Sequence, residues 1–145
     1  QTIPCPVGED IVKELLTRKI LESYVCGKLF KSSLVRENKF IVGVNYEDNI
    51  FSYDVLGNVN KVVYIDKECY FYLKHGGTIT ATCSEKNLND FINSVMYRFN
   101  GVKEKHPNLT LYNYIKDKIK ERLRIENISI NNLDEIEEII GIPEG

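Results

Sequence analysis

The sequence has little of what marks membrane-anchored or secreted proteins. No apolar run approaches the roughly 20 residues that a helix needs to span a bilayer. The first residues also lack the basic start and the apolar stretch of a secretory signal. The chain begins at Gln1 rather than Met, which leaves open whether a segment upstream has been removed. We therefore expect a cytoplasmic protein with no membrane partner.

An excess of charge of one sign is also lacking. The 145 residues include 19 basic and 21 acidic side chains, so the formal net charge is −2. No global field therefore attracts nucleic acid or an anionic membrane. The apolar fraction of 43% and the charged fraction of 28% are ordinary for a globular protein. At this length, one domain over residues 1–145 with a single core is the expectation.

Cysteine is sparse and irregularly spaced. The four thiols belong to Cys5, Cys26, Cys69 and Cys83, which is far below the density of a disulfide-stapled small protein. Two of them fall in or at the end of apolar segments, as small buried hydrophobes often do. We expect reduced structural thiols. The alternative is a disulfide between Cys69 and Cys83, across a hairpin that turns at Gly76-Gly77.

What the sequence does contain is a series of short apolar segments divided by turn residues. They carry the β-branched and aromatic side chains that suit a half-buried sheet. Gly57 and Gly76-Gly77 stand between neighbouring segments, where glycine supplies the backbone freedom of a hairpin. The pattern predicts an antiparallel meander of about five strands within residues 39–83. The segments are Phe40–Tyr46, Asn49–Asp54, Val59–Asp66, Cys69–His75 and Thr78–Cys83.

Helices are expected on both sides of this predicted sheet. Glu9 and Asp10 place negative charge where a helix N-terminus favours it. Further along, Leu88, Phe91, Ile92, Val95 and Phe99 fall on one helical face, which we expect to cover the sheet. The fold class is therefore α+β, with an antiparallel sheet covered by helices. The expected helices are 9–24, 87–99, 111–124 and 132–140.

No catalytic or metal-binding constellation stands out. A zinc site needs three or four converging ligands. Cys69, His75 and Cys83 could meet across one hairpin, but no CxxC or HxxxH pair supports them. No serine or cysteine has the context of an activated nucleophile. We therefore expect no metal and no cofactor.

Three carboxylates near the ends of predicted strands leave an enzymatic alternative open. Asp54, Asp66 and Glu68 could do acid–base work together with His75 in a cleft between hairpins. Acidic residues that border turns more often help to form the turn. We therefore expect a chain that is not an enzyme.

Two local charge features remain. Basic residues between Lys103 and Arg124 lie near Tyr112 and Tyr114, but Asp117 interrupts them, which favours a solvated helix face over a nucleic-acid adaptor. An acidic group close to the C-terminus could instead attract a basic protein, because charge complementarity speeds association. Its members are Asp134, Glu135, Glu137 and Glu138, and Asp48 and Asp54 are second choices as partner-binding residues.

Several of these segments together resemble the SUKH superfamily, and in particular its bacterial immunity members. The resemblance rests on Phe40–Asn45, Ile50–Asp54, Leu56–Val59 and Ser84–Ile92, and on the later segment Tyr114–Arg122. The chain departs from the family in having no tryptophan and in its long predicted hairpin, Tyr64–Cys83. The resemblance implies an α+β protein that binds and neutralises a cognate toxin. It carries over no specific contact residue.

Overall fold

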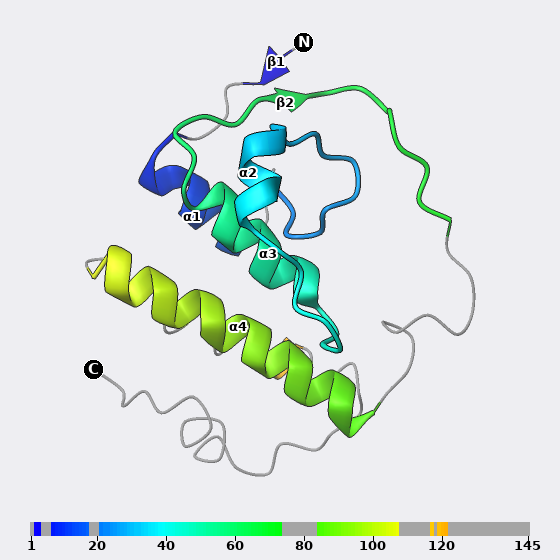
Figure 1. Ribbon diagram of the computed structural model, residues 1–145, viewed down its shortest axis with the longest axis vertical. Helices are drawn as coiled ribbons and strands as arrows, with labels where there is room; N and C mark the ends of the chain where they lie inside the picture. Colours follow the sequence, from blue (N-terminus) through cyan, green and yellow to red (C-terminus); the bar gives the residue numbers. More distant parts are fainter. Residues whose placement is uncertain are drawn as a thin grey trace. The chain divides into compact units, whose positions relative to one another are not determined.

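The computed structural model describes residues 2–3, 7–17, 21–73, 84–107, 117 and 119–121 (Figure 1). The chain is mostly helical and divides into two compact units, residues 1–81 (unit 1) and 82–145 (unit 2). Unit 1 contains β1 (Thr2–Ile3), α1 (Glu9–Thr17), α2 (Ser32–Glu37), α3 (Glu47–Leu56) and β2 (Tyr64–Ile65). Unit 2 contains α4 (Glu85–Lys105).

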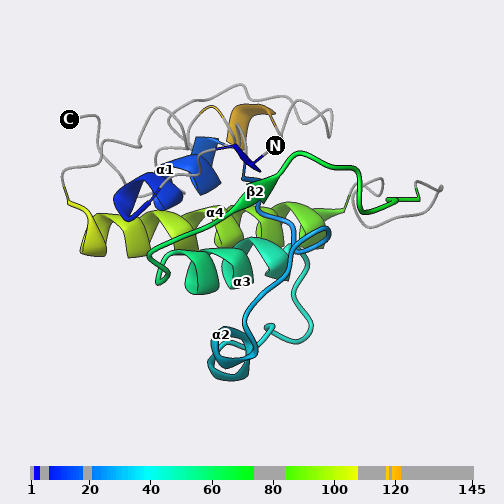
Figure 2. The ribbon, with the colours of Figure 1, turned by 90° about the horizontal axis from the view of Figure 1, so that it is seen from above.

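The predicted five-stranded meander is wrong, and with it the α+β sheet covered by helices. Within the described residues, strand structure is limited to β1 and β2, which lie side by side in Figures 1 and 2. They pair antiparallel, with Thr2 opposite Ile65 and Ile3 opposite Tyr64. The partner of β2 is thus the N-terminal segment, rather than a neighbouring segment of residues 39–83.

Two more of the predicted strands are not strands. One contains residues with left-handed backbone conformations, and the described part of the other has no regular secondary structure. In Phe40–Tyr46, Gly43 has φ 81° and Tyr46 has φ 61°. These left-handed conformations break an extended strand. Residues 69–73 have no regular secondary structure and are exposed. The rest of that segment and the predicted strand at residues 78–83 lie outside the described residues.

The segment Asn49–Asp54, predicted as a strand, lies in α3. Glu47 and Asp48 occupy the first turn, where the helix dipole favours acidic side chains. The helix ends at Gly57, whose N–H donates to the Tyr53 carbonyl over 2.8 Å. A Cβ at position 57 would lie only 2.7 Å from that carbonyl oxygen, so the close approach requires glycine. Glycine ends this helix in the place where the sequence suggested a hairpin turn.

Burial explains why strand-prone residues are helical here. Most of α3 is buried, on more than one side, so its apolar residues show no single stripe. Periodicity cannot assign such a run to helix or strand. Here tertiary packing favours the helix, although the β-branched and aromatic residues favour a strand. The buried residues are Asn49, Ile50, Phe51, Ser52, Tyr53, Val55 and Leu56.

α1 packs against α3 and forms the core of unit 1 (Figures 1 and 2). Ile11 and Leu15 of α1 pack in one cluster with Leu21 and Leu56. These side chains are at most 8% exposed. Phe30, Val59 and Val62 pack against the same cluster while half-buried. α2, by contrast, has no buried residue, and Figure 2 shows it away from α1 and α3.

Two buried serines connect α1 to α3. The Ser23 hydroxyl donates to the Leu15 carbonyl in the last turns of α1, over 3.4 Å. The Ser52 hydroxyl of α3 donates in turn to the Ser23 carbonyl. Both serine side chains are almost fully buried, so these bonds satisfy polar groups that burial would otherwise penalise. Residues 21–24 are not helical, whereas the sequence predicted a first helix that reached residue 24.

α4 includes the whole segment 87–99 that was expected to be helical and extends beyond it at both ends. The expected apolar face is only partly the buried one. Val95, Phe99 and Val102 are buried, whereas Phe91 and Ile92 are half-buried. Of the predicted helix 111–124, residues 117 and 119–121 are described and are helical. The predicted helix 132–140 lies outside the described residues.

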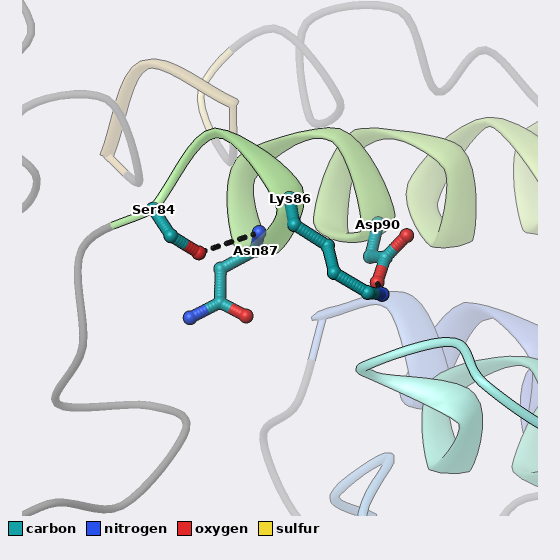
Figure 3. Close-up of polar contacts among 4 residues, drawn as sticks. All are labelled: Ser84, Lys86, Asn87 and Asp90. Atoms are coloured by element: carbon teal, nitrogen blue, oxygen red, sulfur yellow. Dashed lines mark hydrogen bonds and ion pairs between the residues drawn. The ribbon is translucent and has the colours of Figure 1, made fainter.

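Ser84 caps the N-terminus of α4 (Figure 3). Its hydroxyl oxygen accepts a hydrogen bond from the Asn87 backbone N–H over 3.1 Å. In the following turn, Lys86 forms an ion pair with Asp90. The cap satisfies one of the amide groups that the first turn of a helix leaves without an intrahelical partner.

We expect Ser84→Ala to lower the free energy of unfolding of unit 2 by about 1 kcal/mol, because the Asn87 N–H loses its acceptor. Amide hydrogen exchange in the first turn of α4 measures the loss. Ser84→Asp, which can replace the acceptor, is the matched control and should exchange like the wild type. Equal exchange in the alanine variant and the wild type would contradict the cap.

Candidate protein-binding surface

An aromatic cluster in unit 1 reaches from the core to the surface. Phe51 of α3 is 3% exposed. The Phe30 ring meets it edge-on, with centroids 5.8 Å apart. The Phe40 ring stacks on it with centroids 4.3 Å apart and an interplanar angle of 16°. Phe40 is itself 46% exposed, and Ile41 and Val42 beside it are exposed as well. The cluster therefore holds an apolar loop at the surface.

A second exposed apolar segment follows β2. Tyr70, Phe71, Tyr72 and Leu73 are consecutive in sequence, and each is more than half exposed. Phe71 reaches 94%. Single exposed apolar residues are normal on a protein surface. A run of four, three of them aromatic, is the kind of patch that marks an interaction site.

The segment Tyr70–Leu73 lies beside the loop that precedes α2. A Cβ at Gly27 would be 3.8 Å from the Cβ of Tyr70, which is ordinary van der Waals contact. A hydrogen bond between the side chains of Tyr70 and Cys26 raises the pKa of the Tyr70 phenol, and the charge of Cys26 acts in the same direction. Leu29 is fully exposed in the same loop. Tyr70 and Gly27, from two distant parts of the sequence, thus lie side by side.

Lys28 contributes positive charge to this loop. Its ammonium nitrogen lies 4.8 Å from the centre of the Tyr24 ring and donates to the Tyr24 carbonyl. Burial lowers the pKa of Lys28, and Glu22 and Asp48 oppose that shift. The cation–π contact and the backbone hydrogen bond orient the Tyr24 ring, which is half-exposed. We call the exposed side chains of Tyr24, Leu29, Tyr70, Phe71, Tyr72 and Leu73 the aromatic surface.

The carboxylates that the sequence singled out for acid–base chemistry lie on two different segments of unit 1. Asp54 lies half-buried within α3, whereas Asp66 and Glu68 are exposed in the segment that follows β2. His75, their proposed companion, lies outside the described residues. Because α3 replaces the predicted hairpin, Asp54 no longer borders a cleft between hairpins.

Of the three proposed metal ligands, Cys69 alone lies within the described residues. There, no group of three or more His, Cys, Asp or Glu side chains is placed to hold a metal ion. Cys69 is exposed and lies outside any strand, which corrects the expectation of a packed strand thiol. Cys83 falls outside the described residues.

The charged candidates have mixed outcomes. The acidic group of Asp134, Glu135, Glu137 and Glu138 lies outside the described residues. Asp48 lies in the first turn of α3, close enough to Lys28 to influence its pKa. Of the basic stretch, Lys103 and Lys105 lie in the last turn of α4, where the helix dipole favours positive charge.

Sequence reasoning assigned Tyr70–Leu73 to the predicted strand Cys69–His75, and Tyr24 to the end of the predicted helix 9–24. The signal that could have separated them is the run of consecutive large apolar residues at Tyr70–Leu73. Strict alternation, which a half-buried strand shows, is absent there. Leu29 carried no signal, since it is one apolar residue between Lys28 and Phe30.

Comparison with protein-family models, with curated proteins and with solved structures gives no match for this chain. Within the described part of the chain, no helix is both long and apolar enough to cross a membrane.

Proposed function

We propose that this chain works by binding another protein through the aromatic surface, and that it has no catalytic role. The observation that carries the proposal is the exposure of Tyr70–Leu73, whose first residue lies beside Gly27. Tyrosine and phenylalanine are enriched in the cores of protein interfaces, where they bury large areas at low entropic cost. A lysine at the side of such a patch adds orientation through charge.

For the partner class we propose a bacterial toxin domain in the cytoplasm, neutralised by this chain as an immunity protein. The support is the resemblance of Leu56–Val59 and Ser84–Ile92 to the SUKH superfamily, together with that of Tyr114–Arg122 to its immunity members. Two other parts of that resemblance add no support as strands, because Ile50–Asp54 is helical in α3 and Phe40–Asn45 contains Gly43 at φ 81°.

The test is binding to the protein encoded next to this chain's gene, produced as a catalytically inactive domain. We expect the double variant Phe71→Ser/Leu73→Ser to bind at least about 30-fold more weakly, because two anchors of the interface are lost. Val7→Ser is the matched control, since Val7 is also exposed and apolar but lies outside the aromatic surface. Calorimetric titration measures both dissociation constants.

Other results would select another surface or another function. Wild-type affinity in the double variant, together with a slower on-rate in Glu135→Lys/Glu138→Lys, would show that the acidic C-terminal group forms the interface. A turnover that disappears on alanine substitution of Asp54, Asp66, Glu68 or His75 would replace the binding proposal with an enzyme.

A further inference from the structure

A loop that carries α2 projects from unit 1 and is held at both ends by one buried ring. Phe30 precedes α2 and Phe40 follows it, and the rings of both rest on Phe51. The backbone between them thus leaves the core and returns to the same place, as in an Ω-loop. Within this excursion α2 has no buried residue, and Figure 2 shows it away from α1 and α3.

The charged side chains of this excursion are mostly basic. Lys31, Arg36 and Lys39 are exposed, and so is Glu37, the one acidic residue between positions 31 and 43. Three positive charges and one negative charge give these positions a net charge of +2, in a chain whose formal net charge is −2. The charge of the whole chain, which predicted no attraction to anionic surfaces, thus hides a local excess of positive charge. We call residues 31–43 the basic loop.

The basic loop ends in exposed apolar side chains. Val42 is 96% exposed and Ile41 is 44% exposed. Val42 and Gly43 lie in a turn, and Gly43 supplies a positive φ of 81° there. An aliphatic side chain in such a place can leave water for an apolar phase without any loss of core packing.

Hydrogen bonds within the basic loop hold its shape. The Leu34 N–H donates to the Lys31 carbonyl over 3.0 Å at the start of α2. At its end, the Asn38 side-chain amide donates to the Leu34 carbonyl over 2.7 Å. Because the loop is already ordered, little conformational entropy is lost when it binds to a surface.

We propose that the basic loop docks on an anionic lipid bilayer, independently of the aromatic surface. Ile41 and Val42 enter the headgroup region, and the basic side chains lie beside the lipid phosphates. Cations next to an apolar tip are the combination that holds peripheral proteins at such a bilayer. A protein fits this loop less well, because two of its three cations are lysines, which protein interfaces tend to lack. A single-stranded nucleic acid stacks on free aromatic rings, whereas the Phe40 ring is stacked on Phe51.

The test is sedimentation of the full-length chain with vesicles of phosphatidylglycerol and phosphatidylcholine in equal parts. We expect binding that weakens as salt is added, and none to pure phosphatidylcholine. Lys31→Gln/Lys39→Gln should bind about 25-fold more weakly, since each basic residue near an anionic bilayer contributes about fivefold. Lys61→Gln/Lys67→Gln is the matched control, because both lysines are exposed in unit 1 outside the basic loop. It should bind like the wild type.

Val42→Trp tests whether the tip enters the bilayer, because the chain has no other tryptophan. Its emission should shift to the blue with the mixed vesicles, whereas that of Val63→Trp, at another exposed valine, should not. The proposal is overturned by absent binding, by equal losses in the two lysine variants, or by an unshifted Val42→Trp emission.

Other occupants of the basic loop would be recognised by the same variants. If vesicles do not bind, and Lys31→Gln/Lys39→Gln instead weakens binding to a mixed-sequence oligonucleotide, the loop contacts nucleic acid. If that variant instead weakens binding to the product of the neighbouring gene, the loop belongs to a protein interface. Either result overturns the lipid proposal.

Discussion

Phe51→Ala should lower the free energy of unfolding of unit 1 by about 3–5 kcal/mol, the usual loss for a buried aromatic residue. Phe51 is 3% exposed in α3, and the rings of Phe30 and Phe40 both rest on it. Truncation removes the contacts of the Phe51 ring with Phe30 and Phe40. It leaves a cavity between these two rings, which the backbone holds in place. The aromatic pair energies, about 0.5–1.5 kcal/mol each, are lost as well.

Amide hydrogen exchange within α1 and α3 is the appropriate measurement, because it reports on unit 1 even where the two units unfold separately. Phe40→Ala is the matched control. It breaks only one of the two ring contacts at a half-exposed site, and it should cost about 1 kcal/mol. Equal losses in the two variants would show that Phe51 is not the buried centre of the cluster.

The same residue shows why the sequence misled about this part of the fold. Asn49–Asp54 contains β-branched and aromatic residues next to Gly57, a combination typical of a strand before a turn. The acidic pair Glu47 and Asp48 was the contrary signal for a helix start. Burial of most side chains of α3, on more than one side, removes the amphipathic stripe by which a surface helix is recognised, so no periodic signal remained.

Helices with one buried face were easier to predict. Glu9 begins α1 in the structure, as the acidic start suggested, and Ile11, Val12 and Leu15 of that helix are buried. The exposed aromatic surface was harder to predict, because Gly27 and Tyr70 lie side by side only once unit 1 has folded. No local pattern encodes a contact between segments so far apart in the sequence.

Phe99→Ala should have a comparable effect in unit 2, a loss of about 3–5 kcal/mol. Phe99 is 8% exposed, and Val95 and Val102 are buried on the same side of α4, at the four- and three-residue spacings that share a helical face. Ser94 and Arg98 are buried as well, on the other side of this face, and the Ser94 hydroxyl donates to the Phe91 carbonyl over 2.8 Å. Phe99 therefore lies at one edge of the buried face of α4, with Val95 and Val102 between it and Arg98.

Phe91→Ala is the matched control, with the same side chain truncated in the same helix. The sequence placed Phe91 and Phe99 on one apolar face with equal weight, but Phe91 is half-buried in the structure. We expect this variant to lose only about 1–2 kcal/mol. Amide hydrogen exchange in the middle turns of α4 measures both losses. A larger loss for Phe91→Ala than for Phe99→Ala would mean that α4 is rotated, with its N-terminal half against the core of unit 2.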